Sequence, residues 1–328
     1  MKLLVLGGTV FVGRHVVAAA LAAGHAVTIF HRGVSRTDAI DRVESLYGDR
    51  DHDVSALQGR RFDAVIDCSG YTPAQLKRTG EALAAHVANY LFISSRSVYR
   101  CFAPGVDFDE SAAVLDGDDG YGPSKARSEE AIAAALPGHV TIVRPGLIVG
   151  PHDPTGRFTY WPLRLRRGGD VLAPGRPERT VRFIDARDLA LWSVALAARP
   201  PSGIYNVTGA SMTMAALLAA IHREVGGDVR LHWIDDATLL QNAVVPWTEL
   251  PLWLPDSDLA FGGLMDGSDD RAVAAGLKRR PIAETIRDTL AWALGPDAAT
   301  PHAVATMTAQ YEQSLLMTQA AAAPDGAP

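Results

Sequence analysis

The sequence is poor in cysteine, in positive charge and in long apolar runs. Only Cys68 and Cys101 occur among 328 residues, and neither belongs to a disulfide framework or a zinc-binding spacing, so we expect free thiols and no metal site. The formal net charge of -6 argues against nucleic acid or an anionic membrane as the main partner. No run of about 18 apolar residues is present that could span a membrane. These absences predict a globular protein of the cytoplasm.

The composition of the chain is that of a protein with a large core. Hydrophobic residues make up 48% and charged residues 21%, and the length allows roughly two domains. Met1 is followed by a single lysine and then an apolar run, which predicts a strand here and not a signal peptide.

The first residues have the pattern of strand, glycine turn and helix. Lys2 to Leu6 is an apolar run typical of a strand buried on both faces, and Val12 to Ala23 reads as a helix ended by Gly24. Between them stand Gly7, Gly8 and Gly13. Such a turn directs backbone N–H groups and the positive end of the helix dipole at one point, where a dinucleotide pyrophosphate can bind. Val10 occupies the middle glycine position of a G-x-x-G-x-x-G pattern, so a plain strand–helix turn remains an alternative.

The second strand, Ala26 to Phe30, is followed by basic residues. An acid at this place bonds the ribose 2′-hydroxyl of NAD, whereas an arginine accommodates the 2′-phosphate of NADP. His31 and Arg32 stand here, with Arg36 close behind, which favours NADP over NAD. A solvated basic loop is the alternative.

Strand and helix patterns alternate up to about residue 150. The expected strands are 44–47, 62–67, 90–93 and 140–143, and the expected helices are 73–88 and 125–136. This alternation predicts an α/β fold with a parallel, doubly wound sheet. Asp49 follows the third strand and could bond an adenine amino group. Ser69 and Gly70 follow the fourth, where small residues let a ligand pass close to the backbone.

Tyr121 and Lys125 are four residues apart at the start of a helix, so their side chains share one face. A neighbouring ammonium stabilises a phenolate and lowers the tyrosine pKa. A tyrosine so tuned can exchange a proton with a substrate oxygen while hydride moves to or from a nicotinamide. A tyrosine and a lysine on a solvated helix face are the alternative interpretation.

Five motifs together resemble the extended short-chain dehydrogenase/reductases, the NAD-dependent epimerase/dehydratase family. They are LGGTVFVG, DAVIDCSGY, FISSRSVY, YGPSK and VRPGLIVGP, and the resemblance runs from Met1 to about Trp292. It implies a Rossmann-type domain with a smaller C-terminal lid over the substrate. It also implies that Ser95 and Tyr121 are catalytic, and that Lys125 lowers the tyrosine pKa and bonds the nicotinamide ribose.

The resemblance also implies a set of cofactor contacts. The pyrophosphate turn would be formed by Gly7, Gly8, Thr9, Phe11, Val12 and Gly13. Arg32 would contact the adenosine end, and Ser69 and Gly70 would lie along the cofactor. Pro145 and Gly146 would line the nicotinamide pocket.

Two departures from the family pattern bear on function. The sequence G-G-T-x-F-x-G, with Val10, resembles an atypical branch that includes reductase-like proteins and chloroplast stem-loop RNA-binding relatives. Arg96 follows the serine where dehydratases often carry an acid pair, and it could meet an anionic substrate group or be an exposed basic side chain. Further candidate substrate residues are Arg157, Tyr160 and Arg182, since arginines bind phosphate or carboxylate by paired hydrogen bonds.

These patterns predict a domain organisation. Residues 1–150 would form the dinucleotide-binding domain, with 181–210 returning to it, and a strand is expected over 180–184. Residues 151–317 would be mainly substrate-binding, and the low-complexity stretch 318–328 a disordered tail. Helices 73–88 and 125–136 could pair in a homodimer.

Three hypotheses remain. The first is an NADP-preferring oxidoreductase acting on a small polar substrate, possibly anionic or nucleotide-linked, through Ser95, Tyr121 and Lys125. The second is a nucleotide-sugar epimerase that holds NAD tightly. The third is a non-catalytic cofactor- or RNA-binding relative, against which the acidic charge argues.

Overall fold

The computed structural model describes residues 1–35, 43–117, 119–200, 203–296 and 307–322. A parallel sheet of seven strands forms the larger domain, in the order β11-β6-β5-β4-β1-β2-β3. Its strands are β1 Lys2–Leu6, β2 Ala26–His31, β3 Glu44–Tyr47, β4 Phe62–Asp67, β5 Val87–Ile93, β6 Val140–Pro145 and β11 Gly203–Val207. The predicted Rossmann-type, doubly wound sheet is confirmed.

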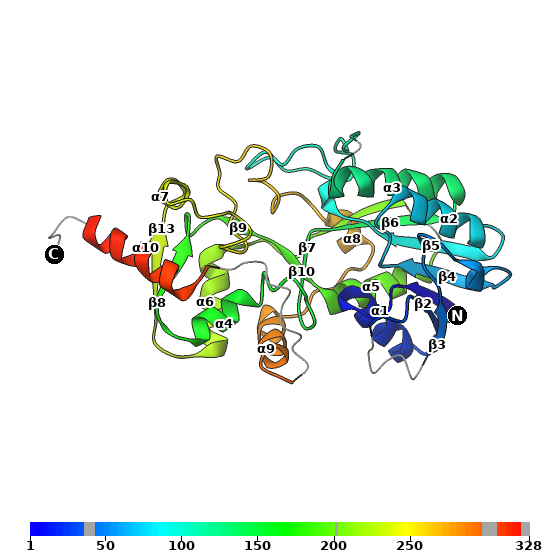
Figure 1. Cartoon of the computed structure of the whole chain (residues 1–328), viewed down its shortest axis with the longest axis horizontal. Helices are drawn as coiled ribbons and strands as arrows, with labels where there is room; N and C mark the ends of the chain where they lie inside the picture. Colours follow the sequence, from blue (N-terminus) through cyan, green and yellow to red (C-terminus); the bar gives the residue numbers. More distant parts are fainter. Residues whose placement is uncertain (36–42, 118, 201–202, 297–306, 323–328) are drawn as a thin grey trace.

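Helices cover both faces of this sheet (Figure 1). α1 (Phe11–Ala22) packs with α5 (Ala186–Ala197) on one face, and α2 (Pro73–Leu83) packs with α3 (Tyr121–Ala135) on the other. The apolar run of β1 reflects this arrangement because Leu3 faces the α1–α5 core and Leu4 faces the α2–α3 core. A strand buried on both faces needs no polar alternation.

Several expected boundaries were wrong. The helix expected to reach Ala88 ends at Leu83, because Val87 begins β5 by pairing with Phe62 of β4. The helix expected from Lys125 begins at Tyr121, after Gly120 with φ 101°. The strand expected over 180–184 is broken into β9 (Thr180–Val181) and β10 (Phe183–Asp185). The break leaves Arg182 between two short strands with different partners, since β9 pairs with β12 (Met212–Thr213) and β10 with β7 (Leu147–Val149).

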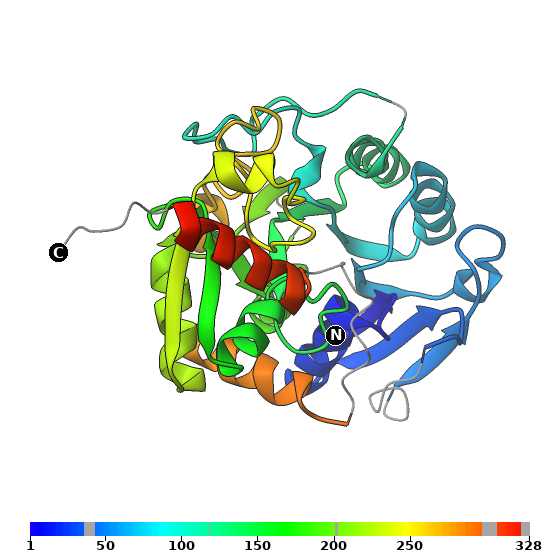
Figure 2. The same cartoon turned by 60° about the vertical axis from the view of Figure 1, so that its left-hand side comes forward.

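Most of the remaining described chain forms a second, smaller part of the fold with its own hydrophobic core (Figures 1 and 2). β8 and β13 pair in parallel, and five helices of the described chain pack around them. The elements are α4 Tyr160–Arg166, β8 Gly169–Pro174, α6 Met214–Val225, β13 Val229–Ile234, α7 Asp236–Gln241, α9 Ile282–Ala293 and α10 Ala309–Ala322. We call this part the lid. The short elements η2 Ser55–Leu57, η3 Arg96–Val98 and α8 Asp270–Ala274 belong to connections in or beside the larger domain.

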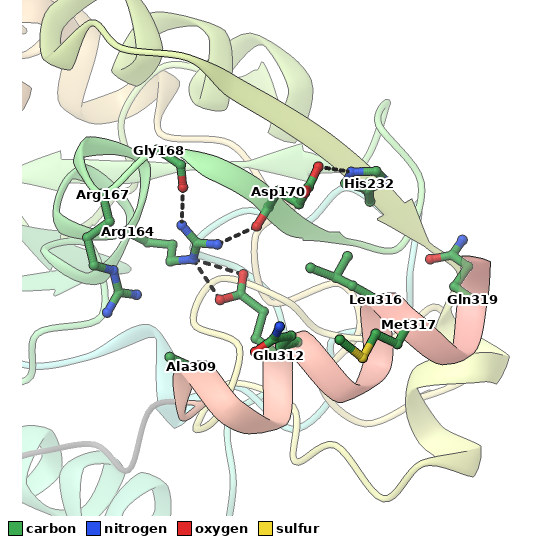
Figure 3. Close-up of a pocket in the computed structure, with 11 residues that line it drawn as sticks. Arg164, Arg167, Gly168, Asp170, His232, Ala309, Glu312, Leu316, Met317 and Gln319 are labelled. Atoms are coloured by element: carbon green, nitrogen blue, oxygen red, sulfur yellow. Dashed lines mark hydrogen bonds and ion pairs between the residues drawn. The ribbon is translucent and has the colours of Figure 1, made fainter. Parts of the chain in front are cut away.

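The last helix, α10, is tied to the lid by a buried ion pair (Figure 3). Arg164 Nε lies 2.7 Å from Glu312 Oε2, and Glu312 also accepts a hydrogen bond from the Leu172 N–H. The expected tail over 318–328 is therefore helical in its first part, up to residue 322, while 323–328 lie outside the described residues. Within the described ranges, none of the helices has the length and apolar character needed to cross a membrane.

Candidate active site

A first cavity of about 390 Å³ lies at the carboxyl ends of β1 to β4. This is where the strand order reverses, the usual ligand position in such sheets. The predicted cofactor residues that line it are Gly7, Thr9, Phe11, Val12, Gly13, His31, Arg32, Asp49 and Ser69. Gly8 instead packs beneath the turn, where an added Cβ would lie 2.8 Å from Ile29.

The glycine turn is built so closely that two of its positions admit no side chain. A Cβ at Gly13 would lie 2.2 Å from the carbonyl oxygen of Gly7. Gly7 has φ +84°, and a Cβ there would lie 2.5 Å from Ser69. Val10, in contrast, is extended at φ -126° and is 49% exposed, so this valine does not distort the turn. It provides no side-chain cap for α1, and the N–H groups of the first turn therefore suit an anionic ligand such as a pyrophosphate.

The residues after β2 form the next part of this cavity. The buried His31 ring lies 4.9 Å from the ring of Tyr47, and its Nδ1 accepts a hydrogen bond from the Gly33 N–H at 3.2 Å. Within the part of the chain that the structure describes, His31 Nε2 has no hydrogen-bond partner. Arg32 is exposed at the cavity, and Arg36 lies outside the described residues.

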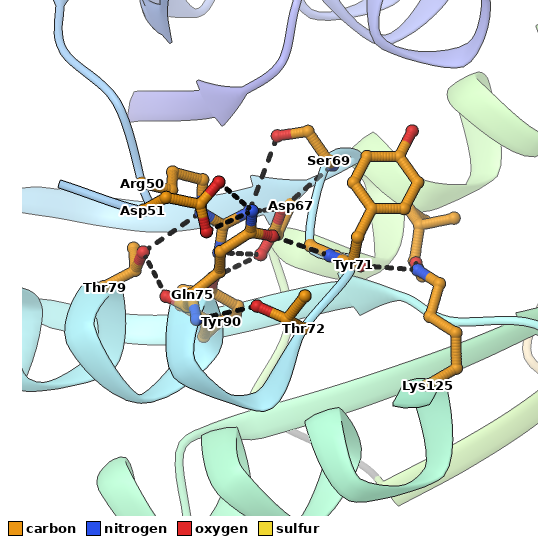
Figure 4. A network of polar contacts seen from close by, with 12 residues as sticks. Arg50, Asp51, Asp67, Ser69, Tyr71, Thr72, Gln75, Thr79, Tyr90 and Lys125 are labelled. Carbon is orange, nitrogen blue, oxygen red and sulfur yellow. Dashed lines mark hydrogen bonds and ion pairs between the residues drawn. The ribbon is translucent and has the colours of Figure 1, made fainter. Parts of the chain in front are cut away.

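A buried ion pair between Arg50 and Asp67 supports the wall of the first cavity (Figure 4), and the sequence did not indicate it. Arg50 Nη1 and Nη2 lie 2.7 and 2.8 Å from the two carboxylate oxygens of Asp67, and the Tyr90 hydroxyl donates to the same carboxylate at 2.6 Å. Asp67 also accepts from the Ser69 N–H, so the pair fixes the turn after β4. Burial next to Asp67 raises the pKa of Tyr90 well above its usual value.

A second cavity of about 380 Å³ holds the predicted catalytic hydroxyls of Ser95 and Tyr121, and Phe11 lines both cavities. We call these two hydroxyls the hydroxyl pair; they are close enough that Ser95 acts to lower the pKa of Tyr121. Ser95 also accepts from the Ser97 N–H at 3.0 Å at the start of η3. Pro145 and Gly146, at the end of β6, line the same cavity.

Lys125 is buried behind the hydroxyl pair. Its ammonium donates to the carbonyl oxygens of Gly70 at 2.7 Å and Ile93 at 3.0 Å, and burial lowers its pKa from 10.5 to about 8. Its Nζ lies 6.0 Å from the centre of the Tyr121 ring. The pKa of Tyr121 is raised, mainly by desolvation of its hydroxyl although the residue is 53% exposed, while Ser95 acts in the opposite direction.

Three of the four predicted substrate residues line the second cavity, namely Arg96, Arg157 and Arg182. The fourth, Tyr160, is packed edge-on against Trp161 in the lid core. Trp247 also lines the cavity. Its backbone has φ 63°, a strained value for a bulky residue, and its ring lies 5.4 Å from the Arg157 guanidinium.

A third cavity, of about 780 Å³, lies between α4, β8, β13 and α10 (Figure 3). Its lining includes the buried Arg164–Glu312 pair, which holds α10 in place. Among the residues described, no group of three or more His, Cys, Asp or Glu side chains could hold a metal ion.

Comparisons with known proteins agree with this geometry. Residues 3–208 match the family model of the NAD dependent epimerase/dehydratase family. The chain is 26% identical over 247 residues to the chloroplast stem-loop binding protein of 41 kDa b of Arabidopsis thaliana, a match that covers 69% of this chain and 63% of that protein. It is also 26% identical over 265 residues to the uncharacterized protein YbjS of Escherichia coli, with 70% of this chain and 77% of that protein covered.

Solved structures share the fold. UDP-glucose 4-epimerase of Thermus thermophilus, in complex with NAD, aligns with TM-score 0.64 and 19% identity over 90% of this chain and 100% of that chain. UDP-glucuronic acid 4-epimerase of Bacillus cereus, with UDP-glucuronic acid and NAD, aligns with TM-score 0.66 and 14% identity over 89% of this chain and 98% of that chain. Since the family model covers well over half of the chain, this protein belongs to the NAD dependent epimerase/dehydratase family, a family of NAD-dependent enzymes.

Proposed function

We propose that this protein is an NAD(P)-dependent oxidoreductase that moves hydride between the nicotinamide and a carbonyl or alcohol of a small polar substrate. The observation that carries the proposal is the hydroxyl pair, which lies in a cavity that shares Phe11 with the glycine turn of residues 7–13, here called the glycine cradle. Because Phe11 lines both cavities, the cavity suited to a dinucleotide lies next to the cavity suited to proton transfer. The bound cofactor would supply or accept the hydride.

Within this proposal the hydroxyl pair has two roles. Tyr121 donates its proton to a substrate carbonyl oxygen as the carbon receives hydride, so that C=O becomes CH–OH, and in the reverse direction it takes the proton back. Ser95 holds the same oxygen by a hydrogen bond. The Lys125 ammonium, fixed on the Gly70 and Ile93 carbonyls, stabilises the tyrosinate that forms during turnover.

We also propose that the cofactor is NADP in preference to NAD. Among the described residues that directly follow β2, the cavity is lined by His31 and Arg32 and by no carboxylate, a pattern that suits a 2′-phosphate and not a free ribose hydroxyl. Because Nδ1 of His31 accepts from the Gly33 N–H, its Nε2 carries the proton and is a buried donor without a partner among the described residues. Asp49, in the turn after β3, remains our candidate for the adenine.

The test of the catalytic proposal is Tyr121→Phe. Loss of the hydroxyl should lower hydride transfer by at least about 100-fold, the usual contribution of a positioned acid–base group, with NADPH affinity unchanged. Tyr311→Phe is a matched control, because that hydroxyl bonds the Asn242 carbonyl in the lid. Turnover of Tyr121→Phe at the wild-type rate would show that the mechanism is wrong.

A nucleotide-sugar epimerase is the second candidate, supported by the aligned epimerases and by the arginines of the second cavity. Such an enzyme returns the hydride within one cycle and has no need to exchange its cofactor. Stoichiometric NAD that stays on the protein through purification would favour it, whereas an empty site that exchanges NADPH would favour the oxidoreductase.

The name of the chloroplast relative raises RNA binding as a third candidate. The net charge of -6 argues against it, since RNA affinity depends on basic surface and falls steeply with salt. A salt-sensitive complex with a stem-loop RNA, and no nucleotide binding, would favour this candidate.

A homodimer through α2 and α3, which pack side by side on one face of the sheet, stays a prediction.

A further inference from the structure

The second cavity carries an excess of positive charge. Three guanidinium groups line it, those of Arg96, Arg157 and Arg182. Among the described residues, Asp153 is the carboxyl group that lines the cavity with them, and its oxygens accept hydrogen bonds from the N–H and Oγ1 of Thr155 at 2.8 and 3.0 Å. Burial raises the pKa of Asp153, while the nearby Arg157 acts to lower it. Among the described residues that line the cavity, three arginines therefore stand against one carboxyl group.

Arg96 is the most deeply buried of the three cations. It is 1% exposed, its guanidinium lies 4.3 Å from the centre of the Phe108 ring, and Nη2 donates to the Asp266 carbonyl. In the described part of the chain its Nε and Nη1 have no hydrogen-bond partner. Burial lowers its pKa to about 10, so the group stays charged at neutral pH. A buried cation with unpaired N–H groups is costly unless negative charge comes near it.

The other two arginines place positive charge around the same space. Arg182 Nη1 donates to the Gly267 carbonyl at 3.0 Å, one residue along from the carbonyl that binds Arg96. The nearby Arg182 is one of the causes that lower the pKa of Arg96. Arg157 lies against the Trp247 ring, and the Nε atoms of Arg157 and Arg182 likewise lack partners among the residues described.

We propose that the substrate is a small anion whose carboxylate or phosphate group binds among Arg96, Arg157 and Arg182, next to the carbon that reacts at the hydroxyl pair. The inference rests on the proposed function, because it names the substrate class of that site. The volume of about 380 Å³ also suits a small molecule, since the same cavity would receive the nicotinamide. Arginine forks bind either anion by paired hydrogen bonds, and Arg96 directly after Ser95 keeps the charge close to the reacting carbon.

Calorimetric titration of the NADPH-saturated protein in low-salt buffer tests this proposal. The probes are oxalate, inorganic phosphate and the neutral diamide oxamide. We expect at least one anion to bind and oxamide not to bind. Tighter oxalate binding would identify a carboxylate substrate, and tighter phosphate binding a phosphate ester. Arg157→Gln and Arg182→Gln, at two half-buried positions, should each weaken anion binding at least tenfold. Arg100→Gln, on an exposed arginine paired with Asp116, should leave it unchanged.

Three results would overturn the proposal: oxamide binding as well as oxalate, unchanged anion affinity in both cavity variants, or no binding of either anion. The test is separable from the proposed hydride transfer. Tyr121→Phe should lose turnover and keep anion binding, so a failed catalytic test leaves the anion site standing. If NADPH itself does not bind, the same titrations of the protein without nucleotide still decide the matter.

Discussion

The buried Lys125 makes the free energy of unfolding depend on pH in the alkaline range. Lys125 is 3% exposed, and burial lowers its pKa from the ordinary 10.5 to about 8. Below about pH 8 both the folded and the unfolded chain carry the proton, and the folded state bears the full cost of the buried charge. Between about pH 8 and 10.5 the unfolded chain binds more protons, so the free energy of unfolding rises with pH in this window.

The size of the effect follows from the shift. With about 1.4 kcal/mol per pKa unit, raising the pH from 7 to 10 should stabilise the wild-type protein through this group by about 2.5 kcal/mol. The Lys125→Met variant has no titrating group at this position, so its free energy of unfolding does not rise in this way between pH 7 and 10. Other groups titrate in the same range, but they do so in both proteins and cancel in the difference.

Urea unfolding of both proteins, without added cofactor, at several pH values from 7 to 10 measures that difference. The free energy of unfolding of the wild-type protein should rise relative to Lys125→Met by about 2.5 kcal/mol across the series. Lys77→Met is the control, because Lys77 is an exposed lysine near Glu81. It should track the wild-type protein. Parallel curves for the wild-type protein and Lys125→Met would refute the reasoning, since they would mean that Lys125 titrates normally.

Three further predictions concern the cofactor cavity and its support. Gly13→Ala places a Cβ 2.2 Å from the Gly7 carbonyl oxygen and should weaken NADPH binding at least tenfold by calorimetry; wild-type affinity would mean that the turn is not the pyrophosphate site. Asp67→Asn removes the partner of buried Arg50 and should lower the free energy of unfolding by about 3–5 kcal/mol in urea; a loss under about 1 kcal/mol would contradict a role for the ion pair. Arg32→Asp should shift the ratio of NADPH to NADH affinities toward NADH, and an unchanged ratio would remove Arg32 from the cofactor site.

The larger domain could be predicted from sequence because its signals are local. The apolar run of β1 reflects burial on both faces, and Gly13 reflects its contact with the Gly7 carbonyl oxygen within one short turn. The Tyr121 and Lys125 pattern marks the start of α3, although the expected start of the helix was four residues late.

Long-range pairing explains what the sequence did not indicate. Arg50 and Asp67 follow or end different strands, so no periodicity connects them, yet they form the ion pair under the cavity. The residues around Val87 in the sequence are compatible with a helix, and its pairing with Phe62 of β4 is what makes it a strand residue. In the lid the strands β9 and β12 have two residues each, too few to show a hydrophobic period. Trp247 reaches the second cavity through loop geometry at φ 63°, which no pattern of residue types predicts.

The central claim is that the glycine cradle and the hydroxyl pair serve one exchangeable nicotinamide dinucleotide. The most direct test is to denature the purified protein, identify any released nucleotide by mass spectrometry, and titrate the stripped protein with NADPH and NADH. The account predicts one dinucleotide per chain, exchangeable, with NADPH bound more tightly than NADH. Failure of the stripped, folded protein to bind either nucleotide would contradict the account.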